Sequence, residues 1–154
     1  MSARYIFDTA PLGSLVRHSD GQPKPPAHFT KKLAAWQRRN ATGRLIKKDP
    51  ARTIGNHIMP ASITLHEGDY ASGGVVVLVV TRTHSLNSEL TFEIVQRPSV
   101  GLVRILHHWG NSSELLHLAS SFADAERWLL EHRYNGAWLE EVLADEAGTS
   151  AFVP

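Results

Sequence analysis

Two segments of the chain show apolar residues at the three- and four-residue spacing of an amphipathic helix. The recurring positions are Phe29, Leu33 and Trp36 in residues 27–40, and Phe122, Ala125, Trp128, Leu129 and His132 in residues 122–134. Pro25 and Pro26 precede the first segment, where a missing backbone N–H is tolerated. Ser121 opens the second segment with the Ser-x-x-Asp signature of a helix start. The pattern therefore predicts two helices.

The second half of the chain changes to β-branched and alternating apolar residues, which predict strands. The predicted strands are residues 62–66, 75–83, 90–95, 102–109 and 114–118, with shorter ones at 13–18 and 44–48. The unbroken apolar run at residues 75–80 predicts a central strand that is buried on both faces. Residues 137–144 fit a helix or a strand, and we assign a strand because a hairpin-like Asn-Gly dipeptide precedes them.

These elements predict an α+β fold in a single domain. We expect an antiparallel sheet of about five or six strands, arranged as a meander, with two helices packed on it. The expected division of the chain is an irregular extended segment at residues 1–26, a basic helix and strand at 27–58, the sheet plus the second helix at 59–144, and a mobile tail at 145–154.

Length and composition limit the class of protein. A chain of 154 residues with 42% hydrophobic residues has the size of one globular domain. Its longest apolar run is residues 75–80, and a bilayer needs about 20 residues, so we expect no membrane span. No signal-peptide hydrophobic region follows Met1, and we expect a cytoplasmic protein. The absence of cysteine excludes disulfides, thiolate zinc sites and iron–sulfur clusters.

The net charge of +1 conceals two oppositely charged parts of the chain. Residues 1–58 hold 11 Lys and Arg against three Asp, a balance of +8, and residues 59–154 hold five against 12, a balance of −7. Such asymmetry indicates a polyanion partner, or two regions that neutralise each other within the fold or between subunits. Eight cations concentrate the positive charge: Lys31, Lys32, Arg38, Arg39, Arg44, Lys47, Lys48 and Arg52.

These eight cations are the candidate nucleic-acid-binding residues. Lys and Arg neutralise phosphates, and release of the displaced counterions drives binding. No helix-turn-helix pair and no aromatic ribonucleoprotein signature accompanies them, so we expect contacts to phosphates rather than to bases. The competing interpretation is a solvated helix face whose long side chains cover apolar surface.

Nine histidines provide a second kind of candidate chemistry, because imidazole binds metals and transfers protons near neutral pH. His107 or His108 would face His117 across a hairpin, and His66 with Asp69 would complete a metal site. The chain contains no HExxH motif or other fixed spacing of metal ligands, so we favour structural or surface histidines.

Residues 64–70 gather a histidine, two carboxylates and a tyrosine around a glycine. Glycine followed by aspartate is ordinary turn chemistry, and no nucleophile accompanies the histidine and the carboxylates. We therefore interpret this segment as a turn between two strands rather than as a catalytic loop.

The chain contains no nucleotide-binding or hydrolase motif. We therefore expect a small non-enzymatic binding protein with no cofactor, whose basic surface from residues 31–52 binds nucleic acid. One alternative is a protein-interaction or self-association module, in which the basic region meets an acidic protein surface or the acidic region of a second copy. A second alternative is a histidine-dependent metal protein or enzyme.

Overall fold

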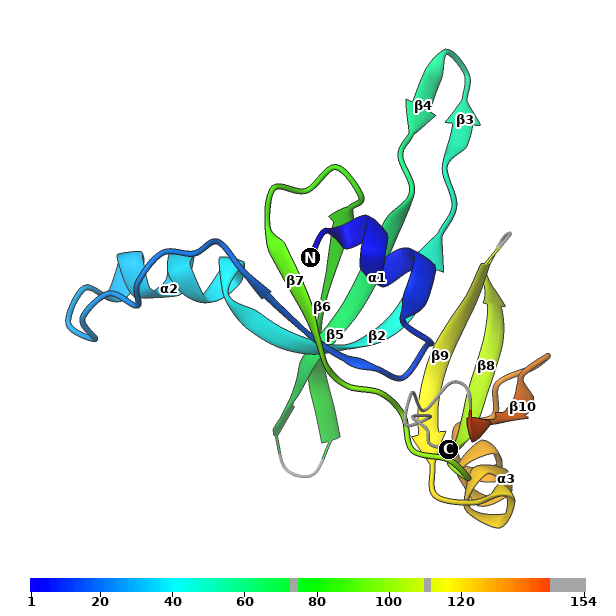
Figure 1. Ribbon diagram of the computed structural model, residues 1–154. Coiled ribbons are helices and arrows are strands. Elements are labelled where there is room, and N and C mark those ends of the chain that lie inside the picture. The colour runs from blue at the N-terminus through cyan, green and yellow to red at the C-terminus, as the bar shows by residue number, and fades with distance from the viewer. Residues whose placement is uncertain (73–74, 110–111, 145–154) are drawn as a thin grey trace, which may run out of the picture.

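The computed structural model describes residues 1–72, 75–109 and 112–144 (Figure 1). Its helices are α1 (Ala3–Thr9), α2 (Thr30–Arg39) and α3 (Phe122–His132). Its strands are β1 (Leu15–Ser19), β2 (Ala41–Asp49), β3 (Arg52–Ile54), β4 (His57–Met59), β5 (Ser62–Ser72), β6 (Val75–Ser85), β7 (Thr91–Gln96), β8 (Val103–Trp109), β9 (Ser112–Ala119) and β10 (Trp138–Glu141). The fold is α+β, as predicted.

Eight of these strands form one antiparallel sheet in the order β10-β8-β9-β2-β1-β7, with β5 paired to β2 and β6 paired to β5. Strand β2 is the junction of the sheet. Its first residues pair with β1, its later residues pair with β5, and Lys47 lies opposite Glu114 of β9. The remaining strands, β3 and β4, form a separate hairpin that projects from the body (Figure 1).

The sheet curls so strongly that strands distant in pairing order face each other. Strands β1 and β6 are separated by β2 and β5, which would place them roughly 14 Å apart in a flat sheet. The rings of His18 on β1 and His84 on β6 nevertheless have centroids only 4.7 Å apart. The inner face of these strands therefore encloses a common interior.

Apolar side chains fill this interior and a second, smaller cluster. The first cluster contains Ala3, Ile6, Ala10, Val16, Leu45, Ile63, Leu65, Leu86 and Phe92. Helix α1 supplies Ala3 and Ile6, and the side chain of Ser2 caps it by accepting the Tyr5 N–H. The second cluster contains Val103, Ile105, Ala119 and Ala125, where α3 packs on β8 and β9.

The sheet is larger than predicted and is not a meander. Residues 1–26, expected to be irregular apart from a short strand at residues 13–18, contribute helix α1 as well as strand β1. Strand β7 pairs with β1, far away in sequence, and not with its chain neighbours β6 and β8. Local patterning specifies which residues are extended, but strand partners depend on contacts that a sequence window does not contain.

The predicted central strand and the predicted turn were also wrong. Within the described residues, β6 pairs only with β5, so the apolar run lies at a sheet edge, and Val79 is 54% exposed. Residues 64–70 lie inside β5, which continues through them with a bulge between His66 and Gly68. A glycine in a strand interior is compatible with a bulge as well as with a turn.

Helix α2 was expected to pack on the sheet, but none of its residues is buried. The indole N–H of Trp36 donates to the Gln22 carbonyl oxygen, 2.8 Å away, which ties the helix to the loop before it. Figure 1 shows α2 standing to one side of the strands. The prediction for residues 137–144 is confirmed by β10, whereas the predicted tail at 145–154 lies outside the described residues.

No helix among the described residues combines the length and the apolar character needed to cross a bilayer.

Candidate functional site

The eight candidate cations separate into three groups. Four of them, Lys31, Lys32, Arg38 and Arg39, are exposed on α2. Three lie on β2 and are partly buried, and Arg52 is exposed on the β3–β4 hairpin. The structure therefore brings together the cations of α2, but it does not join all eight in one surface.

The cations of β2 take part in the fold. Arg44 donates from Nη1 to the Gly13 carbonyl oxygen at 2.6 Å, and burial lowers its pKa. Lys47 pairs with Asp49 at 3.4 Å, and its side chain is only 14% exposed. Burial also lowers the pKa of Lys48. These three side chains are poorly placed to meet a large polyanion.

The cations of α2 are better placed to contact a polyanion. Among the residues that the structure describes, no acidic side chain lies within ion-pair distance of Lys31, Lys32 or Arg38. Arg39 pairs with Asp20 at 3.1 Å and remains 55% exposed. Lys32 also lies over the ring of Phe29, with Nζ 5.1 Å from the centroid.

Five of the twelve acidic residues of the second part of the chain lie on two elements away from α2. Helix α3 and strand β10 carry Asp124, Glu126, Glu131, Glu140 and Glu141, and Figure 1 places both elements on the opposite side of the molecule from α2. The described pair Arg17–Glu93, at 2.9 Å, joins the two charged parts of the chain. The acids of α3 and β10 therefore do not neutralise α2 within the fold.

Of the four residues considered for a metal site, only His107 and His117 can be compared across their strands. His66 and Asp69 both belong to β5, and the side chain of Asp69 is outside the described part. His107 lies opposite Glu114, whereas His117 lies opposite Ile105, so the two histidines do not face each other. His117 instead stacks on Trp128, and burial lowers its pKa.

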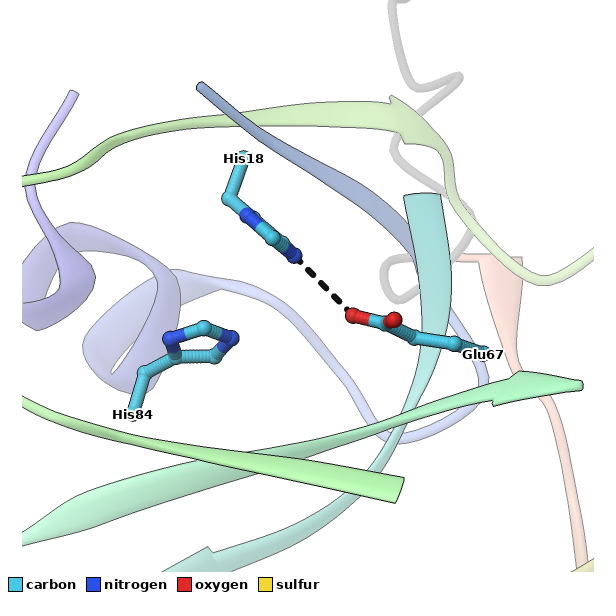
Figure 2. Close-up of side chains that lie close together, drawn as sticks. All are labelled: His18, Glu67 and His84. Carbon is cyan, nitrogen blue, oxygen red and sulfur yellow. Dashed lines mark hydrogen bonds and ion pairs between the residues drawn. The ribbon is translucent and has the colours of Figure 1, made fainter. Parts of the chain in front are cut away.

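A different set of residues converges inside the curled sheet: His18 of β1, Glu67 of β5 and His84 of β6 (Figure 2). Alternation explains their direction, because Glu67 follows Ile63 and Leu65 on the buried face of β5. His84 lies opposite Ile63 in the β5–β6 register and so shares that face. The polar cluster therefore continues the apolar core.

Both ring nitrogens of His18 face oxygen acceptors, and its side chain is fully buried. Nδ1 lies 3.1 Å from the Arg39 carbonyl oxygen, and Nε2 lies 3.0 Å from Oε2 of Glu67. The other carboxylate oxygen, Oε1, accepts a hydrogen bond from Nε of Arg82 at 2.8 Å. Glu67 is thus held between a histidine and an arginine in a site where its side chain is 10% exposed.

His84 has a different environment. Its Nε2 is buried and has no hydrogen-bond partner among the described residues. The ring packs against His18 and edge-on against Phe92, with a centroid distance of 5.3 Å to the latter. Burial and the neighbouring His18 lower the pKa of His84 to about 4, so its imidazole is neutral near pH 7. An unpartnered buried nitrogen is rare in proteins and calls for an explanation.

A groove of about 470 Å³ opens beside this cluster. Its walls include Gln37 and Arg38 of α2, Thr42 of β2, and Glu67 and Arg82 near the cluster. Neutral imidazole and carboxylate are also ordinary metal ligands. The cluster therefore has the chemistry to hold a cation, with an approach along the groove.

Sequence reasoning missed this cluster because its members are far apart in the chain and Glu67 was assigned to a turn. One signal was present: Ile63, Leu65 and Glu67 occupy alternate positions. Reading the strand through Gly68 would have placed a carboxylate on the buried face. Nothing local indicates that β1 meets β6.

A protein-family model described as "Uncharacterised conserved protein UCP036055" matches residues 1–146. No curated protein and no solved structure matches the chain.

Proposed function

Because the chain belongs to the UCP036055 family, whose description names no activity, we propose its function from the geometry: it is a non-enzymatic protein that binds a polyanion, nucleic acid in particular, through the exposed cations of α2. The observation that carries this proposal is the exposure of Lys31, Lys32 and Arg38 without acidic partners among the described residues. A helix that buries none of its residues in the fold is available to a partner.

The expected contacts are to phosphates. Lys supplies a point charge, and Arg supplies a planar fork that matches phosphate oxygens. Gln37 is also exposed on α2 and can donate a hydrogen bond to a phosphate or sugar. Since no base-reading motif accompanies these residues, we propose binding that is independent of base sequence. We also propose that the protein is located in the cytoplasm.

Fluorescence anisotropy of labelled duplex DNA and single-stranded RNA, titrated with untagged protein, tests the proposal. If three phosphates are neutralised on duplex DNA, affinity falls roughly 40-fold between about 50 and 200 mM salt. The triple variant Lys31→Glu, Lys32→Glu, Arg38→Glu should lose binding and the salt dependence together.

A matched control is the reversal of three exposed cations elsewhere: Arg4, Arg127 and Arg133. This control variant has the same net charge as the α2 variant, so only the position of the cations differs. Equal binding by the α2 variant and the wild type, with both proteins folded, would refute the α2 site. Equal loss in both variants would show that net charge, and not α2, governs binding.

One observation favours an acidic protein surface as the alternative partner. The acids of α3 and β10 lie on the opposite side of the molecule from α2, so the acidic side of one copy can meet α2 of another. That interaction predicts a solution mass above 17.0 kDa at low salt that falls as salt screens the charges. Light scattering at two salt concentrations distinguishes such a homo-oligomer from a monomer that binds nucleic acid.

A further inference from the structure

We propose that His18, Glu67 and His84 bind one divalent first-row transition metal ion through two imidazole nitrogens and a carboxylate oxygen. The three residues come from β1, β5 and β6 and meet only because the sheet curls. The site uses none of the cations proposed to contact phosphates, although Arg38 of α2 and Glu67 line the same groove.

The distances are close to those of a metal site. One ligand atom from each residue lies within 4.8 Å of the other two. With metal–ligand distances of about 2.1 Å, the ligand atoms of a tetrahedral ion lie ~3.4 Å apart. Nε2 of His18 and Oε2 of Glu67 already lie 3.0 Å apart, so the main adjustment falls on His84. The 4.8 Å limit exceeds the tetrahedral separation by ~1.4 Å, so the imidazole of His84 has to shift by at most about that distance to enter the coordination sphere.

The surroundings of two ligands also match a metal site. A metal-binding histidine usually donates its other ring N–H to a carbonyl or carboxylate, which fixes the nitrogen that binds the metal. Nδ1 of His18 is placed to donate to the Arg39 carbonyl oxygen, which leaves Nε2 for the metal. Arg82 holds Oε1 of Glu67 and leaves Oε2 facing the histidines.

A bound ion would satisfy two ring nitrogens of the cluster at once. Nε2 of His18 faces a carboxylate oxygen, and two acceptors repel unless a proton or a cation lies between them. Nε2 of His84 is buried without a hydrogen-bond partner among the described residues. One metal ion shared by these atoms satisfies both nitrogens.

The donor set selects the class of metal. Imidazole with carboxylate suits Zn²⁺, Fe²⁺, Co²⁺ and Ni²⁺, whereas Mg²⁺ and Ca²⁺ prefer oxygen ligands. Three protein ligands leave at least one coordination position free, as in catalytic zinc and non-haem iron sites. Glu67 lines the groove beside the cluster, which gives water or a small ligand an approach to that position.

The rival interpretation is a doubly protonated His18 that donates to both Arg39 and Glu67, with no metal. Arg82 favours this rival electrostatically, because its positive charge beside Glu67 opposes a divalent cation. The metal interpretation requires one bound ion and no proton on Nε2 of His18, whereas the rival has a proton on Nε2 and no ion. Metal stoichiometry and the protonation of Nε2 can both be measured.

The experiment titrates untagged, chelator-treated protein with Co²⁺ and follows the visible d–d absorption, then displaces Co²⁺ with Zn²⁺. We expect one equivalent to bind. His84→Phe and Glu67→Gln should each weaken binding by more than about a hundredfold, since loss of an outer-shell partner alone costs 10–100-fold. His84→Phe keeps an aromatic ring against Phe92 and removes no hydrogen bond from Nε2, so we expect it to fold even if Glu67→Gln does not.

His66→Gln is the matched control, because His66 is the neighbour of Glu67 on β5 and points to the other face of the strand. Its Co²⁺ affinity should equal that of the wild type. Binding of less than one equivalent, or unchanged affinity in folded His84→Phe, would overturn the site. Nitrogen-15 NMR of the Zn²⁺-saturated protein adds a direct test: two protonated ring nitrogens on His18 would establish the rival ion pair instead.

Discussion

The behaviour of individual histidines in this protein is set by what each ring contacts. His117 is half-buried on β9 and stacks on Trp128, with centroids 5.1 Å apart and planes within 7°. Burial lowers its pKa and outweighs the attraction of Asp124, which acts in the opposite direction. The folded state therefore prefers the neutral imidazole at this position.

This preference predicts a loss of stability in acid. An unfolded histidine has a pKa of about 6.5, so below that pH the unfolded chain takes up a proton that folded His117 resists. The free energy of unfolding then falls as the pH drops below about 6.5. His117→Phe retains the stacked ring without the titration, and we expect its unfolding free energy to fall less between pH 7.5 and pH 5.

Urea unfolding at both pH values measures the difference. His57→Gln, on the exposed β3–β4 hairpin, serves as the control and should keep the wild-type pH dependence. The prediction fails if His117→Phe and the wild type lose equal stability on acidification.

At the scale of elements, the close approach of β2 and β5 positions Glu67. A Cβ on Gly43 would lie 2.9 Å from Cβ of Leu65, 3.0 Å from the His66 carbonyl oxygen and 3.1 Å from Cγ of Glu67. Only glycine allows the two strands to lie this close. The bulge in β5, between His66 and Gly68, lies at the same point of the strand.

Gly43→Ala should therefore destabilise the protein by about 1–3 kcal/mol, as overpacking of a filled interior does. Gly68→Ala is the matched control, because a Cβ there meets nothing within 4 Å, and we expect a change below about 0.5 kcal/mol. Chemical denaturation of both variants checks the pair. Equal effects would mean that backbone conformation, rather than the contact with Leu65 and Glu67, decides the cost.

Helix α2 should be nearly independent of the core. Leu33 is only partly buried, whereas Leu65 is completely buried in the first cluster. We expect Leu33→Ala to cost less than about 1 kcal/mol and Leu65→Ala to cost about 2–5 kcal/mol. Comparable losses in denaturant midpoint would show that α2 is packed more tightly than its exposure indicates.

The elements differ in how far the sequence specifies them. The repeating positions Leu33 and Trp36, and Trp128 and Leu129, are close in the chain, so their helices were predicted near their observed bounds. Helix α1 was missed because its seven residues are too few to show a clear period, and packing of Ile6 in the core stabilises it. The pairing of β7 with β1 depends on distant contacts and has no local signal.

The candidate sites differ in the same way. The cations of α2 are neighbours in the sequence, so their grouping was predictable once the helix was recognised. His18, Glu67 and His84 are distant from one another in the sequence, and their meeting requires the curl of the sheet. Sequence reasoning considered a pair of His107 or His108 with His117 only as an alternative to structural histidines, and the observed register between β8 and β9 does not place His107 opposite His117.

At the scale of the whole molecule, the charge asymmetry of the sequence becomes an asymmetry of the fold. The cations of α2 stand at one side, and the acids of α3 and β10 lie at the other. The net charge of +1 averages over both and describes neither side. A polyanion at short range responds to the local surface, because salt screens charges beyond about 10 Å at 0.1 M.

This local control predicts how binding depends on pH. Lowering the pH from 8 to 6 protonates exposed histidines and raises the net charge, but the Lys and Arg charges of α2 stay constant. At fixed salt, this change of pH should therefore alter the affinity for duplex DNA far less than the triple substitution of Lys31, Lys32 and Arg38 does. His28 is exposed, contacts the ring of Phe29 and lies just before α2, so its own effect on binding has to be removed from the comparison. The measurement is therefore made on the His28→Gln variant. If lowering the pH changes its affinity for DNA as much as the triple substitution does, the net charge of the molecule governs binding, and not α2.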